Sequence, residues 1–161
     1  MKAITLWQPY ASFMAIGLKQ NETRSWATKF RGELAICAAK RKPELYSDGI
    51  CTLAWENKHR INPEWKESEP MSKLFPLGVI MCVVEVYDCL SVAQIESRNR
   101  SGQDDQIFIS DDESMLGDYS AGRFAWLTRN VRRLKEPVPV SGKQGFFNLT
   151  QDIEKKVRMQ L

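Results

Sequence analysis

The sequence predicts an α+β fold, a small mixed β-barrel or strongly curved sheet of about six strands with flanking helices. Three observations predict it. About six or seven short strand patterns are interleaved with three or four helix patterns, without the regular alternation that a parallel sheet requires. The length of 161 residues, with no linker or repeat, fits one domain over residues 1–161. A content of 43% hydrophobic and 27% charged residues excludes a disordered chain.

Apolar runs and turn residues predict the amino-terminal elements. Residues 3–7 are apolar and predict a strand. Gln8-Pro9 then opens a helix, because proline in the first turn lacks only an N–H that would be unpaired there. Gly17 is suited to end that helix in a left-handed conformation. Residues 22–26 and 33–39 predict the next two strands.

The middle of the chain is less regular. A helix is expected from Pro43 toward Trp55, although Gly49 disfavours it. Residues 57–76 contain several prolines and little periodicity, which indicates a loop with helical fragments. Residues 79–87 are β-branched and apolar and predict the clearest strand of the chain.

Caps and short apolar runs define the last elements. Ser91 caps a short helix, and residues 102–117 predict an acidic surface loop with a short strand at 107–109. Thr150 caps a final helix with one apolar stripe. The remaining strands are expected at residues 123–129, 138–140 and 145–149.

Several functional classes are excluded. The longest apolar run, residues 77–84, is too short for a membrane-spanning helix of roughly 20 residues, and the first residues resemble no signal peptide. A cytoplasmic location with free thiols is therefore expected. The cysteines and His59 lack the spacing of a metal site, and no phosphate loop or dinucleotide fingerprint occurs. We therefore expect neither a metal nor a cofactor, and His59 on the surface.

The net charge of +3 is unevenly distributed. Residues 19–42 and residues 123–143 each carry a balance of +5, whereas residues 96–118 carry −5. If the two basic segments meet on one face, they can hold a polyanion. The alternative, which charge alone favours, is an ordinary solvated surface.

The most informative segment is residues 17–26, which follows the first helix and enters a strand. Side chains alternate along a strand, so Glu22, Arg24 and Trp26 share one face, with Lys19 just before them. An acid, a guanidinium and an indole can together bind a phosphate or a base edge and stack on a ring. The structural alternative is a core Trp26 beside a Glu22–Arg24 ion pair.

Several ordered motifs of the chain resemble the ASCH domain, the activating signal cointegrator homology domain. The segment Gly17-x-Lys19-x-x-Glu22-x-Arg24 matches that family's Gly-x-Lys-x-x-Glu-x-Arg signature. The similarity covers nearly the whole chain except residues 44–73 and 95–120. The other segments that carry it are residues 4–12, 31–36, 38–40, 78–90, 122–126, 136–140 and 142–145.

The resemblance implies a PUA-like β-barrel whose signature lines a cleft that receives RNA or a nucleoside. Some small ASCH proteins resemble amidohydrolases of N4-acetylcytidine that use a lysine, a threonine and a glutamate. The lysine maps onto Lys19 and the glutamate onto Glu85, but Glu22 stands at the threonine position. Thr23 would point to the opposite side of a strand. ASCH members described as nucleic-acid-binding cofactors or ribonucleases carry glutamate at that position, as this chain does.

Glu85 has two interpretations, because it lies between Val84 and Val86 in an apolar strand. Burial would raise its pKa toward general acid–base use, and a nearby Lys19 would stabilise its charge. Alternatively Glu85 lies on the solvent face of the strand, since the two valines share the other face.

The remaining candidates lie near the ends of elements. Tyr10 and Ser12 begin the first helix, where they either meet a phosphate or cap and pack the helix. Lys40 and Arg41 follow a strand end and either hold backbone phosphates or form a solvated charge run. Trp7 and Trp126 have patterns more typical of a core than of a stacking platform. The full candidate set is Lys19, Glu22 and Glu85 as catalytic residues and Tyr10, Ser12, Arg24, Trp26, Arg31, Lys40 and Arg41 as nucleic-acid-binding residues.

Two functions from different classes remain open. The first is an RNA-binding module that admits one base beside Lys19, Glu22 and Arg24. The second is a hydrolase, either an amidohydrolase of acylated cytidine or a metal-independent ribonuclease, in which Lys19 activates the reacting group and Glu22 or Glu85 moves protons. The acidic loop suggests a weaker third role, as a docking surface or as an internal mimic of nucleic acid. Its Asp104, Asp105, Asp111 and Asp112 are more typical of a solvated loop than of a cation site.

Overall fold

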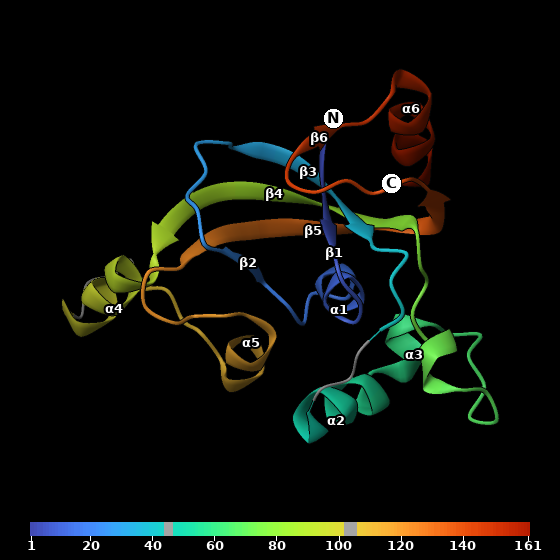
Figure 1. The fold of residues 1–161 in the computed structure, drawn as a ribbon, viewed down its shortest axis with the longest axis horizontal. Coiled ribbons are helices and arrows are strands. Elements are labelled where there is room, and N and C mark those ends of the chain that lie inside the picture. Colours follow the sequence, from blue (N-terminus) through green and yellow to red (C-terminus); the bar gives the residue numbers. More distant parts are fainter. Residues whose placement is uncertain (44–46, 102–105) are drawn as a thin grey trace.

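One strongly curved sheet organises the computed structural model, which describes residues 1–43, 47–101 and 106–161 (Figure 1). Within these residues the sheet has six strands in the order β2-β5-β4-β3-β1-β6. Among these described strands, only β1 and β3 pair in parallel. The strands are β1 (Lys2–Leu6), β2 (Asn21–Arg24), β3 (Gly32–Ala38), β4 (Val79–Ser91), β5 (Phe124–Pro139) and β6 (Phe147–Asn148). The predicted α+β class and curled, barrel-like sheet are confirmed.

The long strands β4 and β5 give the sheet its curvature. Their antiparallel register shifts three times between Ile80 and Asp88 of β4. Such irregularities bend a strand and increase its twist. The strands expected separately at 123–129 and 138–140 are one continuous strand, because Val131 and Leu134 of the charged stretch between them still pack into the core.

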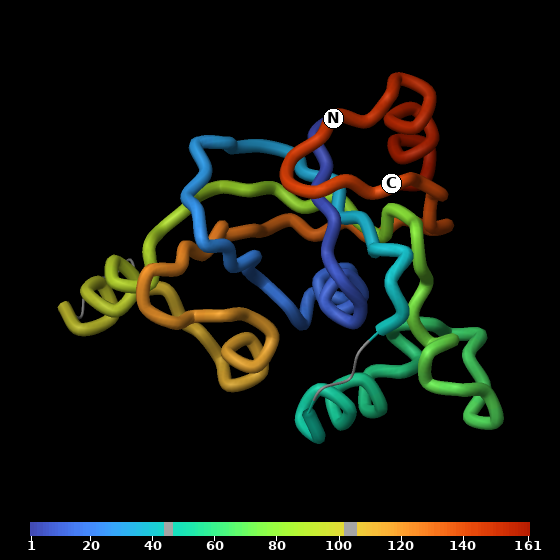
Figure 2. The backbone as a smooth tube through the Cα atoms, viewed as in Figure 1, coloured from blue at the N-terminus to red at the C-terminus, as the bar shows by residue number. Residues whose placement is uncertain are grey.

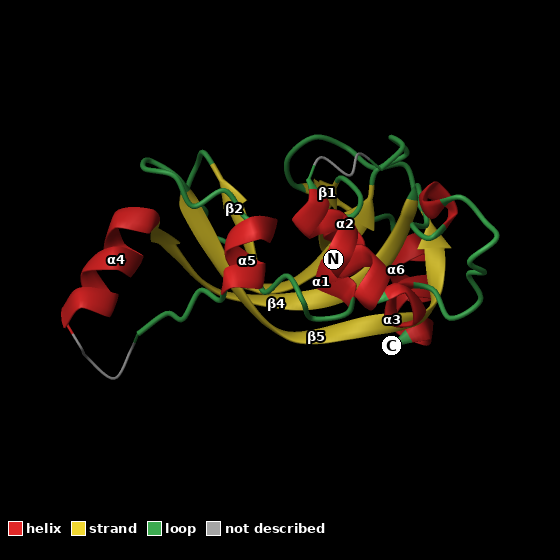
Figure 3. Ribbon diagram, turned by 90° about the horizontal axis from the view of Figure 1, so that it is seen from below, coloured by secondary structure: helices red, strands yellow, loops and turns green. Residues whose placement is uncertain are grey.

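Alternation of side chains divides the core between the two faces of the sheet. In β3, Ile36 joins a cluster with Met14 of α1 (Tyr10–Ala15), whereas the adjacent Cys37 joins a cluster with Val157 of α6 (Gln151–Gln160). The two helices therefore cover opposite faces (Figures 1 and 3). The predicted cap of α6 is confirmed, since Thr150 accepts a hydrogen bond from the backbone N–H of Ile153.

Trp126 of β5 belongs to the same cluster as Met14 and Ile36 and is fully buried, which confirms the expectation of a core residue. Phe146 stacks on it with ring centroids 5.0 Å apart and an angle of 13° between the rings. The ring of Trp26 packs edge-on against that of Trp126, with the two ring centroids 4.6 Å apart. These contacts fix the loop before β6 to the sheet.

The end of α1 positions the segment that follows it. Gly17 adopts the left-handed conformation, with φ of +77°, as expected of a C-terminal cap. The backbone N–H groups of Leu18 and Lys19 both donate to the carbonyl of Phe13, at 2.9 and 3.2 Å. The chain therefore leaves α1 in a fixed direction and enters β2 at Asn21.

Residues 47–78 form a helical layer at one end of the sheet, and the path of this segment can be followed in Figure 2. It contains α2 (Asp48–Glu56), α3 (Lys58–Ile61) and the 3-10 turn η1 (Met71–Lys73). Ser47 caps α2, which begins later than the expected Pro43. The predicted helical fragments within residues 57–76 are present, and Phe13 of α1 packs among the buried side chains of this layer.

The acidic region differs from its prediction. Instead of a loop with a strand at 107–109, the described part contains α5 (Asp111–Leu116) after an irregular 107–109 segment. Ser110 caps this helix, and the acidic residues in its first turn stabilise it by interacting with the positive end of the helix dipole. The expected helix after Ser91 is α4 (Val92–Ser101), with Val92 and Ile95 buried. Asp104 and Asp105 lie outside the described residues.

Two features are absent from the part of the chain that the structure describes. No helix there is long and apolar enough to cross a membrane. No cluster of three or more histidine, cysteine or carboxylate side chains within residues 1–43, 47–101 and 106–161 is placed to hold a metal ion. Cys37, Cys51, Cys82 and Cys89 are free thiols.

Gly17→Ala tests the cap that directs Lys19. No atom lies within 4 Å of the added Cβ, so the substitution reports backbone strain alone. We expect the free energy of unfolding to fall by about 1 kcal/mol, measured by urea denaturation. Gly17→Asn should lose less, because asparagine visits this conformation more readily. Unchanged stability of Gly17→Ala would contradict this account.

Candidate functional site

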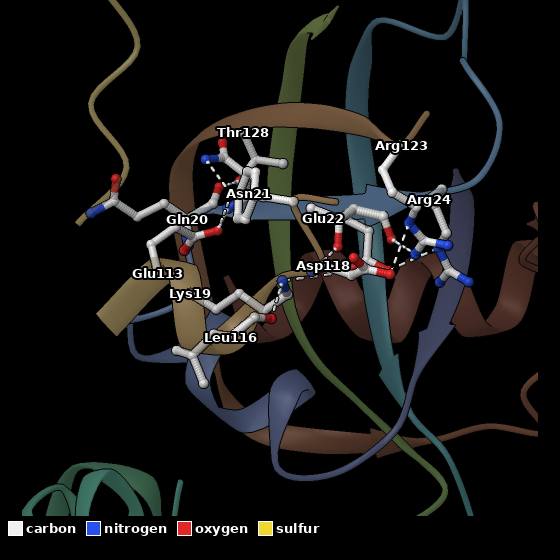
Figure 4. A network of polar contacts seen from close by, with 12 residues as sticks. Lys19, Gln20, Asn21, Glu22, Arg24, Glu113, Leu116, Asp118, Arg123 and Thr128 are labelled. Atoms are coloured by element: carbon white, nitrogen blue, oxygen red, sulfur yellow. Dashed lines mark hydrogen bonds and ion pairs between the residues drawn. The ribbon is translucent and has the colours of Figure 1, made fainter. Parts of the chain in front are cut away.

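The signature segment lies in a cleft of about 510 Å³ between the end of β1, the strand β2 and the chain that leaves α5 (Figure 4). Lys19, Glu22 and Arg24, which the sequence predicts to lie together, all line it. The other lining residues are Thr5, Leu6, Trp7, Tyr10, Thr23, Met115, Leu116, Gly117, Asp118 and Arg123.

Lys19 and Glu22 form a buried ion pair at this cleft. They are only 2% and 7% exposed, and their Nζ and Oε2 atoms are 3.7 Å apart. Lys19 Nζ also donates to the carbonyl oxygen of Leu116 at 2.7 Å. A buried ammonium needs such oxygens, because removal from water is otherwise very costly. The ion-pair interpretation of Glu22 and Arg24 is confirmed as well, with Arg24 Nε 2.8 Å from Glu22 Oε1.

Two guanidinium groups border the cleft. Arg24 donates to the carbonyl of Thr5 at 3.4 Å, and Arg123 donates to the carbonyl of Thr23 at 3.4 Å. Arg123 Nε also lies 3.2 Å from a carboxylate oxygen of Asp118. Both arginine side chains remain partly exposed, so each can still meet an anion.

Thr23 lies closer to the cleft than its position in a strand predicts. Its hydroxyl oxygen accepts a hydrogen bond of 2.8 Å from the backbone N–H of Asp118. The residue lines the cleft because the chain after α5 returns to β2, where Asp118 and Arg123 both donate hydrogen bonds to Thr23. Its hydroxyl is therefore engaged in holding that chain segment.

The helix α5 holds the signature segment in place, a role that the sequence did not indicate. Glu113 is 1% exposed and accepts hydrogen bonds from the backbone N–H groups of Gln20 and Asn21, at 2.5 and 3.2 Å. It also accepts from the Tyr119 hydroxyl at 2.6 Å. Burial, reinforced by Glu113, raises the pKa of Tyr119. The available signal was Ser110-x-x-Glu113, a pattern that begins helices.

A second hollow of about 560 Å³ adjoins the cleft and shares Thr5, Trp7 and Arg24 with it. Lys40 lines it from the first basic segment and Lys143 from the second. The two basic segments therefore meet on one surface, as the charge pattern allowed.

Glu85 lies elsewhere. Its carboxylate accepts hydrogen bonds from Arg129 and Asn130, both at 2.7 Å, and it lines a separate hollow on the sheet. Those hydrogen bonds lower its pKa, with Arg129 the larger cause, so the buried alternative, in which the pKa would rise, is not the one observed. The solvent-face interpretation holds, because Val84 and Val86 occupy the buried face. Glu85 and Lys19 are not brought together.

Of the other predicted nucleic-acid-binding residues, some line the cleft and others do not. Tyr10 lines the cleft, and burial raises the pKa of its hydroxyl. Ser12 is fully buried within α1, so no phosphate reaches it there. Arg31 is paired with Asp88 at 2.7 Å, away from the cleft. Trp26 is partly exposed but packs on the core rather than lining the cleft.

Comparison with known proteins gives the family. The sequence profile of the ASCH domain matches residues 4–138. The chain belongs to the ASCH family. Activating signal cointegrator 1 from Homo sapiens and from Mus musculus are 22% and 23% identical over 158 residues. The match covers 98% of this chain and 24% of each relative, so the chain spans about a quarter of their length.

Solved ASCH structures share the fold. The ASCH protein of Zymomonas mobilis superposes with a TM-score of 0.54 at 15% identity, covering 98% of this chain and 93% of that one. A variant of that protein, in which phenylalanine replaces one tyrosine, gives the same TM-score, with 96% of its chain covered. These likenesses show that the curved α+β sheet of this chain is a fold shared with solved ASCH proteins.

Glu113→Gln tests the support of this ASCH signature. The new amide cannot accept from all three donors and places its own N–H groups against one of them. We expect the free energy of unfolding to fall by about 2 kcal/mol, measured by urea denaturation. The matched control is Asp111→Asn, an exposed first-turn position of α5, where we expect less than about 1 kcal/mol. Equal losses in the two variants would refute the role of Glu113.

Proposed function

We propose that this ASCH domain binds RNA and admits one nucleoside or nucleotide into the cleft beside Lys19, Glu22 and Arg24. The observation that carries the proposal is the buried Lys19–Glu22 pair at a cleft bordered by two guanidinium groups. RNA binding is general in the family, which supports the same conclusion.

The buried pair offers a nucleobase both kinds of hydrogen-bonding group. Lys19 has three N–H donors, of which one is used by Leu116 and one faces Glu22. Each Glu22 oxygen can accept a second hydrogen bond beyond its existing ion-pair contact. A base edge that presents a carbonyl next to an N–H group would satisfy both residues.

The size and charge of the cleft also suit a nucleotide. Its volume of about 510 Å³ falls within the range of small-molecule sites, roughly 300–1,000 Å³. Arg24 and Arg123 present guanidinium groups that match the geometry of a phosphate. Asp118 contacts Arg123 in the free protein, so a phosphate would replace one carboxylate contact.

Binding is tested with a labelled single-stranded RNA of about 10 nucleotides at about 50 mM salt, where phosphate contacts are strong. We expect Arg24→Gln to weaken binding about tenfold. The slope of log affinity against log salt should fall by the equivalent of about one phosphate contact. Lys135→Gln, at an exposed position of β5, should change affinity less than about twofold. Fluorescence anisotropy measures both. Absence of binding to the wild type, or equal affinity of the two variants, would reject the proposal.

A second candidate is hydrolysis, which the same buried pair favours. An ammonium 3.7 Å from a carboxylate in a sheltered cleft can polarise a carbonyl while the carboxylate moves a proton. Glu85 is bound by Arg129 and Asn130 and lines a different hollow from Lys19, so Glu22 is the acid–base candidate.

Hydrolysis is tested by incubating the protein with N4-acetylcytidine and, separately, with single-stranded RNA. A hydrolase would release cytidine or cut the RNA, and Lys19→Met and Glu22→Gln would abolish that activity, read by chromatography. Circular dichroism establishes that each variant is folded. No product from the wild type, or undiminished activity in folded Lys19→Met, would exclude this candidate and leave the binding function.

A further inference from the structure

The charged residues described in the lining of the second hollow, next to the cleft, are all basic. Arg24, Lys40 and Lys143 line it, and none of its lining residues is acidic. It shares Thr5, Trp7 and Arg24 with the first cleft, so the two form one continuous surface. A ligand that fills the first cleft can therefore extend directly into the second.

Trp7 lies at the junction of the two hollows. The strand β1 ends at Leu6, so Trp7 falls just beyond it and is 53% exposed. The expectation of a core residue was therefore wrong. The guanidinium of Arg41 lies 4.2 Å from the centre of its ring, a cation–π contact that leaves more than half of the residue open to solvent. A large exposed aromatic side chain in a basic groove is the arrangement on which single-stranded bases stack.

The cations of the second hollow are held by the fold. The stem of Lys40 lies against Gly78, where an added Cβ would come within 2.9 Å of it. Lys143 donates its backbone N–H to the hydroxyl of Thr5 at 3.1 Å. Gly142 approaches Thr5 so closely that a Cβ there would lie 2.6 Å from its hydroxyl oxygen. The charges therefore face the hollow from fixed backbone positions.

We propose that Trp7 stacks the nucleotide adjacent to the one in the first cleft, and that Lys40 and Lys143 bind its phosphate. The ligand is then a single-stranded RNA segment of at least two nucleotides, since the faces of bases inside a duplex are covered by the neighbouring base pairs and are closed to an indole. This inference rests on the proposed function and specifies its substrate class.

The test compares 5′-mononucleotides, dinucleotides and octanucleotides of each RNA base, with binding measured by calorimetry. We expect wild-type affinity to rise from mononucleotide to dinucleotide. Trp7→Ala should weaken dinucleotide binding between about fivefold and about a hundredfold while changing mononucleotide binding much less. Trp55→Ala is the matched control, because Trp55 is 44% exposed and carries the ammonium of Lys58 at 4.2 Å, on α2 outside both hollows.

The role of the two lysines in the second hollow is tested separately with the double variant Lys40→Gln/Lys143→Gln. We expect the slope of log affinity against log salt for the octanucleotide to fall by about one to two phosphate contacts. Lys135→Gln should leave the slope unchanged, being an exposed lysine of β5 outside both hollows.

The outcomes separate the two proposals. Mononucleotides that bind as tightly as dinucleotides, or equal losses in Trp7→Ala and Trp55→Ala, would overturn the stacking site and leave the first cleft intact. Failure of every RNA ligand to bind the wild type would overturn both. Equal affinity for a hairpin duplex closed at both ends and for a single strand would also reject the inference, because the base faces inside such a duplex are covered by neighbouring pairs.

Discussion

The ammonium group of Lys19 is almost completely withdrawn from water, and this one constraint governs the arrangement around it. A buried cation must be surrounded by oxygens, and Leu116 and Glu22 supply them from two different elements. The carbonyl of Leu116 is available because α5 ends beside β2. Glu113 fixes that helix by binding the backbone of Gln20 and Asn21, so the charge and the scaffold depend on each other.

The curvature of the sheet places the buried Lys19 at the edge of an open cleft. Bulges in β4 and β5 bend the sheet around α1, which brings β2 and the end of β1 to the same side. The cleft is therefore lined by segments that are far apart in the sequence, from Thr5 to Arg123. None of these residues is chemically unusual, and the site arises from their placement.

Much of the fold could be predicted, because alternation and capping are local. The strands around Ile36 and Val84 and the cap at Thr150 follow from a few neighbouring residues. In the candidate site, the grouping of Lys19 with Glu22 was predictable for the same reason. The contacts of Glu113 were not, because they join residues more than ninety positions apart. The partner of Glu85 was not predictable for the same reason, since Arg129 lies 44 positions away in the sequence and the apolar neighbours of Glu85 gave no sign of it.

The loop before β6 is secured at both ends, by Thr5 on one side and by the stacking of Phe146 on Trp126 on the other. Such a loop loses little conformational entropy when a ligand arrives, because its order already exists in the free protein. Association then requires no folding step. Under the proposed RNA binding, differences in affinity among RNA sequences would arise mainly from the dissociation rate of each complex rather than from its association rate.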